Sequence, residues 1–256
     1  MVNYLDYEQG SIEWLEARGG LTTASMFTVC RGITGGMTDQ QRVYVDLVMS
    51  GSDPKDAAPL AGYKTKPSGA GIAKALAGEK VGEYSQKTKN YAFRLAVERI
   101  SGELLSNPYE FQPWQADRGN ELEEEARIKY EAKTFNLVQQ VSLAVTDDGL
   151  FGASLDGLVD DDGSIEIKCF LNPEKLASIL LDGDVGTVVD QMQGGMWITG
   201  RSWCDFVLYC PALKCIGKDI TVIRFNRDEE YIHKLEQDLL EFNELVSTYI
   251  KKLKEV

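Results

Sequence analysis

The stretch FGASLDGLVDDDGSIEIKC, residues 151–169, joins two short apolar runs through a turn of aspartates and glycine. β-Branched, aliphatic and aromatic residues on both sides of 160–163 predict two antiparallel strands linked by a tight turn. Three charged residues, Asp156, Glu166 and Lys168, interrupt runs that would otherwise suit a buried sheet. Because charged groups are costly to bury without partners, their placement indicates a chemical role.

A simple hairpin places these three side chains on one face of the sheet. With Asp161-Asp162-Gly163 as the turn, the expected register sets Asp156 opposite Lys168 and Leu158 opposite Glu166. Directly opposed residues share a face, and so do residues i and i+2 of one strand. The three charged groups then converge, whereas a slip of one residue would move Asp156 to the other face.

Two carboxylates beside one amine suit a magnesium site for phosphodiester cleavage. Mg²⁺ takes a few carboxylates together with waters and substrate phosphate oxygens, and the carbonyl of Ile167 could add a ligand. Lys168 would orient the attacking water or offset phosphate charge, and Glu123 on an acidic stretch upstream could complete the coordination. The alternative interpretation of these residues is a set of solvated charges beside a turn.

Composition excludes several other classes of protein. The chain of 256 residues is 43% hydrophobic, and no apolar run approaches the roughly 20 residues of a membrane span. The start of the sequence lacks the pattern of a signal peptide, and five cysteines without a C-x-x-C pair argue against a disulfide framework. A single histidine, His233, argues against a Ser-His-Asp hydrolase. We therefore expect a cytoplasmic protein with no membrane partner.

The distribution of charge leaves a nucleic-acid partner open. A net charge of −13 opposes phosphate binding at first sight. Residues 60–94, however, hold seven Lys or Arg residues against two acids. Such a segment could form a basic track on an otherwise acidic protein.

Hydrophobic periodicity predicts an α/β protein. Residues 11–31 are typical of a helix, a Gly-Gly break and a second helix beginning near Thr22 or Thr23. Longer helices are predicted over 82–106, over 119–133 and over 184–199, with strands between them after residue 136. The order predicts one domain, 1–256, whose mixed sheet is flanked by helices and which contains a helical insertion at 32–106.

Four blocks of the sequence resemble the phage lambda-type exonuclease (YqaJ-like viral recombinase) family of PD-(D/E)XK nucleases. The blocks are IEWLEARGGLTTASMF, RGNELEEEARIKYE, GASLDGLVDDDGSIEIKC and QMQGGMWITGRSWCDFVLYCP. They occur in the family's order and together cover about 11–31 and 113–211. The resemblance implies a PD-(D/E)XK nuclease-like core with a central mixed β-sheet.

The resemblance also implies roles for individual residues. It implies that Mg²⁺, for which Mn²⁺ could substitute, is bound by Glu123, Asp156, Glu166 and the carbonyl of Ile167. Lys168 would be the catalytic lysine, and Gln191 the glutamine that supports the site from the next helix. Arg18, Ser25 and Ser154 match positions that hold the 5′-terminal phosphate of DNA in such enzymes.

Two departures from the family's pattern bear on these roles. Leu155 stands where a proline usually precedes the catalytic aspartate, a change that should affect only the local backbone. Glu174 stands where a basic phosphate-binding residue often follows the lysine by six positions, with Lys175 next to it and Phe170 in place of a usual proline. The second departure puts strict dependence on a 5′-phosphate in doubt, but not metal-dependent cleavage.

Residues 38–78 resemble the helix-turn-helix start of phage terminase small subunits, above all in the pattern Q…AA…AGY. A helix-turn-helix sets a recognition helix against DNA, and the basic excess of 60–94 fits that role. The alternative is a packing lid whose lysines are merely solvated.

The leading hypothesis is a Mg²⁺-dependent exonuclease that degrades one strand of linear duplex DNA from its end, 5′ to 3′, for phage-type recombination. The resemblance implies a homotrimer in a bacterial host cell, encoded by a phage or prophage, whose product passes to a single-strand annealing protein. Two alternatives stay open: an endonuclease of the same fold, and a catalytically inactive DNA-binding module.

Overall fold

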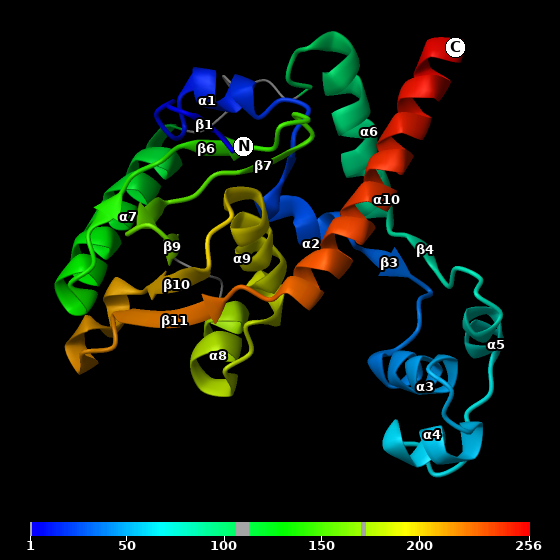
Figure 1. Ribbon diagram of the computed structural model, residues 1–256. Helices are drawn as coiled ribbons and strands as arrows, with labels where there is room; N and C mark the ends of the chain where they lie inside the picture. The colour runs from blue at the N-terminus through cyan, green and yellow to red at the C-terminus, as the bar shows by residue number, and fades with distance from the viewer. Residues whose placement is uncertain (1, 106–112, 170–172) are drawn as a thin grey trace. The chain divides into compact units, whose positions relative to one another are not determined.

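The computed structural model describes residues 2–105, 113–169 and 173–256 (Figure 1). The chain forms two compact units. The larger unit comprises Met1–Cys30 and Tyr91–Val256, and the smaller unit comprises Arg31–Asn90. The insertion expected at 32–106 within a single nuclease domain stays a prediction. In the described part of the chain, no helix combines the length and apolar character required to span a membrane.

A five-stranded mixed sheet forms the centre of the larger unit. Its strands follow the order β11-β10-β9-β8-β5, with bounds β5 Val138–Gln139, β8 Gly157–Val159, β9 Gly163–Cys169, β10 Trp203–Tyr209 and β11 Ile220–Asn226. Strands β9 and β10 are parallel, and the other neighbours are antiparallel. The mixed sheet and the α/β class agree with the expectation from sequence.

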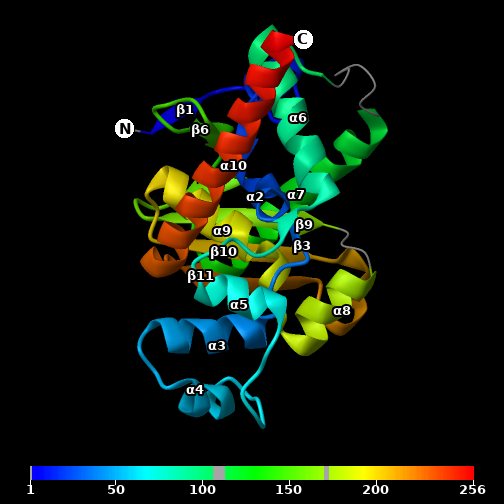
Figure 2. The same ribbon diagram turned by 90° about the vertical axis from the view of Figure 1, so that its right-hand side faces the viewer.

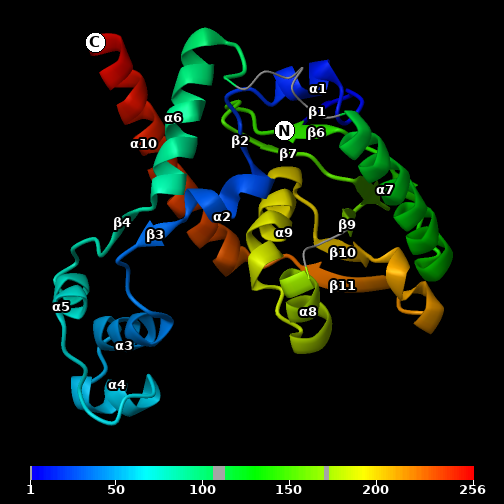
Figure 3. The same cartoon turned by 180° about the vertical axis from the view of Figure 1, so that it is seen from behind.

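Helices cover both faces of this sheet, and the alternation of side chains along β10 shows why. On one face, Val207 and Tyr209 pack with Ala126 and Tyr130 of helix α7 (Pro113–Thr134). On the other face, Cys204, Phe206 and Leu208 pack with residues of α8 (Pro173–Asp182) and α9 (Gly186–Thr199). Seen from behind, α9 and α8 lie over the strands β10 and β11 (Figure 3). Both faces of the central strands β8, β9 and β10 are therefore largely buried, which explains their nearly continuous apolar runs.

The register between β8 and β9 differs from the predicted one. The observed partners are Gly157 and Ile165, Leu158 and Ser164, and Val159 and Gly163, so the expected pairing of Leu158 with Glu166 is wrong. Gly163 is the first residue of β9 and pairs with Val159, and its missing side chain makes room for the Trp203 ring, which lies 2.1 Å from where a Cβ would stand. Asp160 instead enters the turn with φ +48°, a conformation that aspartate tolerates. The shift is by two residues, so Glu166 and Lys168 keep their predicted face.

A second sheet, ordered β1-β6-β7-β2, lies in the same unit. Its strands are β1 Asn3–Leu5, β2 Thr22–Thr23, β6 Leu143–Val145 and β7 Phe151–Ala153. The helix expected to begin near Thr22 or Thr23 begins at Ala24 with Thr23 as its N-cap, and both threonines also pair with β7 in parallel. Only a 3₁₀ turn at Ala24–Met26 and the single helical turn α2 (Phe27–Cys30) follow, after the short helix α1 (Ile12–Ala17).

Two helices complete the core of the larger unit. The C-terminal helix α10 (Glu229–Glu255) runs beside the later turns of α6 (Gln86–Ser101) in both views (Figures 1 and 2). Tyr91 stacks on Phe242 with ring centroids 5.7 Å apart, and Phe93 meets Tyr249 edge-on at 5.9 Å. Helix α6 is shorter than the predicted helix over 82–106, and the end expected at Asn107-Pro108 lies outside the described residues.

The smaller unit has its own apolar core. Its helices are α3 (Asp39–Met49), α4 (Pro54–Leu60) and α5 (Ala70–Leu76), and a two-stranded pair joins β3 (Ile33–Thr34) to β4 (Glu83–Tyr84). Tyr44, Ala57 and Ile72, one from each helix, meet in this core. Local signals fix the helix starts: Thr38 and Gln41 form a capping box, and Asp53 caps α4 ahead of Pro54.

Candidate active site

Glu166 of β9 is the centre of a hydrogen-bonded group in the larger unit. Its Oε1 atom accepts hydrogen bonds from Lys168 Nζ and from Gln191 Nε2 of α9, each at 2.5 Å. Lys168 follows two residues later on the same strand, so both side chains point to one face. Glu166 is only 3% exposed. A buried carboxylate of this kind requires a cationic or amide partner, and it has both.

Asp156, just before β8, is held against the same strand. The backbone N–H of Ile167 donates to Asp156 Oδ2 at 2.5 Å. Ile167 lies between Glu166 and Lys168, so this bond ties Asp156 to the middle of the Glu-x-Lys segment. The structure thus brings together the three charged residues on which the sequence argument rested.

Burial, with repulsion among the acids, raises the pKa values of the carboxyl groups of the site. Burial, together with the charge of Glu123 and against the opposing effect of Lys168, raises the pKa of Asp156 to about 7. Burial also raises the pKa of Glu166 to about 7, although Lys168 lowers it. The pKa of Glu123, on α7, is raised by burial too, while a hydrogen bond with Asp156 lowers it. Three carboxyl groups from three elements therefore share one electrostatic environment.

Lys168 is held in its charged form. Burial alone would lower the pKa of Lys168, but the carboxylates of Glu166 and Asp156 raise it above its ordinary value. The ammonium group therefore stays protonated within a cluster of acids. A fixed cation at this place can offset charge on a bound phosphate.

The donor set suits a hard divalent cation, although the described residues form no ready metal cage. No three His, Cys, Asp or Glu side chains in 2–105, 113–169 and 173–256 converge as metal ligands. Glu166 and Asp156 are instead bonded to protein donors. Carboxylate oxygens in a desolvated, mutually repelling group are nevertheless the ligands that Mg²⁺ prefers, and a cation would relieve their repulsion.

The predicted phosphate-holding residues are brought together only in part. Arg18 Nη1 donates to Ser154 Oγ at 2.5 Å, and the guanidinium lies 4.2 Å from the centroid of the Trp14 ring. Burial lowers the pKa of Arg18, an effect that the charges of Tyr91 and Glu166 oppose. Ser25 is exposed and its hydroxyl lies 3.3 Å from Thr23 Oγ1.

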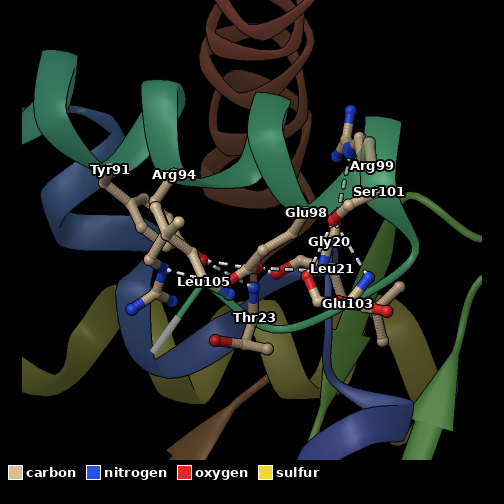
Figure 4. A network of polar contacts seen from close by, with 10 residues as sticks. All are labelled: Gly20, Leu21, Thr23, Tyr91, Arg94, Glu98, Arg99, Ser101, Glu103 and Leu105. Carbon is tan, nitrogen blue, oxygen red and sulfur yellow. Dashed lines mark hydrogen bonds and ion pairs between the residues drawn. The ribbon is translucent and has the colours of Figure 1, made fainter. Parts of the chain in front are cut away.

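A polar network on α6 holds the loop that follows Arg18 (Figure 4). Glu98, 3% exposed, accepts from the backbone N–H of Gly20 at 3.0 Å and of Leu105 at 3.3 Å. Arg99 Nε donates to the carbonyl of Gly20 at 2.8 Å. Sequence reasoning missed these residues. The signal was present, because Glu98 falls on the helical face that carries the apolar residues Tyr91 and Leu95.

A cavity of about 520 Å³ opens beside the acidic group. Three site residues contribute to its wall, namely Glu123, Asp156 and Ile167. The other residues of the wall come from the N-terminal segment, α7 and the chain before β6: Asp6, Tyr7, Glu8, Gln9, Glu124, Arg127, Gln140, Val141 and Ser142. None of these nine was expected from sequence.

The departures from the family's pattern occupy different environments. Leu155 is buried, and its carbonyl accepts a hydrogen bond from Gln9 Nε2 at 2.9 Å, so a leucine is accommodated there. Glu174 and Lys175 are exposed on α8. Phe170 lies outside the described residues.

A mixed sheet with an aspartate before one strand and Glu-x-Lys on the next defines the PD-(D/E)XK nuclease-like fold. The model of the YqaJ-like viral recombinase domain matches residues 13–202. The chain therefore belongs to this family, and the resemblance seen in the four sequence blocks is confirmed. No curated protein matches the sequence.

Solved structures give the same picture. An alkaline exonuclease (LHK-Exo) from Laribacter hongkongensis is 27% identical, with a TM-score of 0.65, over 96% of this chain and 97% of that chain. A structure of LHK-Exo in complex with dAMP is 29% identical, with a TM-score of 0.63 and the same coverage.

Proposed function

We propose that the protein is a divalent-metal-dependent DNA exonuclease that degrades one strand of linear duplex DNA from its end, 5′ to 3′. The observation that carries the proposal is the buried Glu166 carboxylate, held by Lys168 and Gln191 beside Asp156. Membership of the recombinase family and the likeness to an alkaline exonuclease over nearly the whole chain support it.

Each residue of the group has a role in this proposal. The metal, Mg²⁺ or in its place Mn²⁺, would be held by Glu123, Asp156, Glu166 and the carbonyl of Ile167. When bound, it supplies a water of lowered pKa and neutralises charge on the phosphate and the leaving oxygen. Lys168 orients the attacking water or offsets phosphate charge, and Gln191 keeps Glu166 in position.

End recognition is assigned to Arg18 and its neighbours. The Arg18 guanidinium, bonded to Ser154, presents the planar set of donors that suits a terminal phosphate. Ser25 would add a hydroxyl. With Glu174 in the place of a basic residue, this grip relies on Arg18 more heavily than the family's pattern implies.

The wider setting follows from the family. We propose that the enzyme works on duplex DNA ends as a homotrimer in the cytoplasm of a bacterial host, encoded by a phage or prophage. Its single-stranded product would pass to a phage annealing protein during recombination.

The test is digestion of a linear duplex in Mg²⁺ by the wild type, Glu166→Gln and Lys168→Ala. We expect both variants to lose activity by at least about 100-fold, because each removes one half of the buried pair. Glu244→Gln, an exposed change on α10, is the matched control and should remain active. Full activity in Glu166→Gln would contradict the proposal.

An endonuclease of the same fold is the second candidate. Glu174, an exposed acid where a phosphate-binding cation is expected, favours it because a weak grip on the 5′-phosphate would reduce the preference for ends. An inactive DNA-binding module has less support, since the buried pair of Glu166 and Lys168 has no evident use in binding alone.

A further inference from the structure

Strand β11 forms one edge of the central sheet (Figure 1). It pairs with β10 on one side only. Whereas β10 is almost fully buried, every residue of β11 is at least partly open to solvent. The strand contains no proline, and the four residues from Ile220 to Ile223 are all β-branched. A long, apolar edge of this kind is a template on which a further strand can pair.

Alternate residues of β11 present their backbone groups to the outer side of this edge. Just before β11 begins, the N–H of Cys210 donates to the carbonyl of Asp219 at 2.8 Å. Because an antiparallel ladder alternates, this bond assigns the odd-numbered residues of β11 to β10 and turns the even-numbered residues outward. The outward N–H and carbonyl groups of Val222 and Arg224 have no hydrogen-bond partner among the described residues. Two donors and two acceptors are therefore open at the middle of the edge.

The one charged side chain of β11 does not protect the edge. Arg224 donates to both carboxylate oxygens of Asp205, each at 2.7 Å, and its guanidinium lies 3.7 Å from the centroid of the Trp203 ring. These contacts hold the guanidinium over the face of the sheet. Charges that project from an edge normally prevent edge-to-edge pairing. The edge of β11 is thus left open to a partner strand.

The charges on either side of β11 indicate which partner fits. Exposed side chains of opposite sign flank the strand, namely Lys214 and Lys218 before it, and Asp228, Glu229 and Glu230 after it. Glu229 is paired with Arg227, so Asp228 and Glu230 give the second flank its net charge. Two copies of β11 in antiparallel alignment bring the basic flank of each copy against the acidic flank of the other. A parallel alignment would oppose like charges, so the charge pattern selects the antiparallel pair.

We propose that two copies of this chain pair in antiparallel alignment through β11, about a twofold axis at Ile223. Val222 of each copy then exchanges both backbone hydrogen bonds with Arg224 of the other, and Lys218 lies opposite Asp228. The contact is isologous, so it closes after two copies and leaves no open edge. It does not rest on the proposed nuclease function. A ring of three, which requires head-to-tail contacts, would be joined by it to a second ring.

The first test removes an outward donor and keeps the bonds to β10. Val222→Pro lacks only an N–H that faces away from β10, and an edge strand tolerates proline at such a position. Val222→Ala is the control, because it keeps this N–H. We expect full-length Val222→Pro to form an assembly of half the wild-type mass in analytical ultracentrifugation, while Val222→Ala keeps the wild-type mass. Equal masses for the wild type and a folded Val222→Pro would overturn the proposal and leave the edge to a strand from another protein.

Charge reversal tests the alignment without a change in the strand itself. Lys218→Glu should weaken self-association by about fivefold or more, because the exposed ion pair occurs twice in a twofold contact. Adding Glu230→Lys to this variant should restore association. Lys252→Glu, at an exposed position of α10, is the control and should associate as the wild type does. If Lys218→Glu associates no more weakly than this control, the antiparallel alignment is wrong.

Cysteine substitution locates the twofold axis. At the axis two Ile223 residues face each other in a non-hydrogen-bonded pair with Cα atoms about 4.5 Å apart, a separation that a disulfide can bridge. The exposed Cys215 is first replaced by serine. On oxidation with diamide, Ile223→Cys should then link two chains, whereas Thr221→Cys, which lies opposite Phe225 of the other copy, should not. Linkage through Thr221→Cys and not through Ile223→Cys would overturn the proposed register.

Discussion

Glu166 Oε1 accepts hydrogen bonds from two side chains, and the two donors stabilise the carboxylate in different ways. Lys168 supplies the charge that makes a buried carboxylate tolerable, and Gln191 supplies direction from a separate helix. Removing the lysine leaves an uncompensated buried charge, whereas removing the glutamine leaves the charge paired but freer to move. Sequence reasoning identified both residues, but only the fold shows that they share one oxygen atom.

The two glutamines of α9 offer a matched pair of substitutions. Gln191→Ala should reduce kcat by about 10- to 100-fold, as for other residues that orient a metal ligand, with little change in melting temperature. Gln193 instead donates to the carbonyl of Asn226 at 2.9 Å and accepts from the N–H of Asp228 at 3.0 Å. Gln193→Ala should therefore lower stability and spare the chemistry. Equal effects of both changes on kcat at equal stability would contradict this division.

Substitution of Arg18 tests the proposed recognition of the 5′-phosphorylated end. Arg18→Lys keeps the charge but loses the planar fork that contacts Ser154. We expect the rate on 5′-phosphorylated ends to fall by about tenfold, toward the rate on unphosphorylated ends. The measurement is the ratio of the two initial rates. An unchanged ratio would remove Arg18 from phosphate recognition.

At the scale of elements, α6 supports the chain that follows Arg18. Its buried Glu98 accepts from the N–H of Gly20, and its Arg99 donates to the carbonyl of Gly20, two residues after Arg18. Tyr91 OH, from the same helix, lies within hydrogen-bond range of Thr23 N at 3.5 Å and Leu21 O at 3.4 Å. The helix thus sets the path of the chain between Arg18 and Ser25.

Glu98→Ala tests this support. This change leaves the backbone N–H groups of Gly20 and Leu105 without their acceptor and removes the ion-pair partner of Arg94. The free energy of unfolding should therefore fall by about 3 kcal/mol. The preference for 5′-phosphorylated ends should weaken as well, because the loop after Arg18 loses its anchor. Denaturant unfolding and the ratio of rates on the two kinds of end measure the two effects. Glu103→Ala, an exposed change on the chain after α6, is the control; a Glu98 variant as stable as the control would refute the support.

Elements also show which features of the fold a sequence can predict. Alternation along β10 and the apolar stripes of α9 predicted the strands and the helix, because periodicity depends on local chemistry. The predicted register of β8 and β9 was wrong by two residues. Gly163 was expected in the turn but lies in β9, where it packs against the Trp203 ring of a strand distant in sequence. The strand at Thr22–Thr23 was missed for the same reason, since its partner β7 is remote in sequence.

The candidate site follows the same pattern. Glu166 and Lys168 could be predicted because they lie on one strand, where the face of each side chain follows from parity, and Asp156 directly precedes the neighbouring strand. Arg127, Ser142 and Glu98 could not, because their positions depend on how α7, the chain before β6 and α6 pack in three dimensions. Of these three, only Glu98 could be singled out from the sequence, because it is a charged residue on an otherwise apolar helical face.

At the scale of the whole molecule, three exposed lysines gather in one part of the smaller unit. Acids and bases are mixed on α3 and at the start of α4, where Arg42 and Lys55 stand among the aspartates, whereas Lys64, Lys66 and Lys74 are exposed on α5 and the chain before it. Helix α5 packs on the others through Ile72, which directs the opposite side of this helix to solvent. These lysines suit phosphate contacts with duplex DNA, the first of the two interpretations that the sequence left open.

Reversing these charges distinguishes the two interpretations. Lys64→Glu, Lys66→Glu and Lys74→Glu together should weaken binding to a closed-circular duplex and reduce the slope of log K against log salt by roughly 2 to 3. Lys251→Glu, Lys252→Glu and Lys254→Glu on α10 form a control of equal charge change. If both triple variants bind alike, the lysines of the smaller unit are only solvated.

The most direct measurement compares three DNA substrates with the whole protein in Mg²⁺. They are a linear duplex with 5′-phosphates, the same duplex without them, and a covalently closed circle. We predict loss of one strand from the phosphorylated linear duplex, slower loss from the unphosphorylated one, and an intact circle, with no cleavage by Glu166→Gln. Cutting of the circle would contradict the exonuclease and leave the endonuclease, and DNA binding without cleavage in any divalent metal would contradict both.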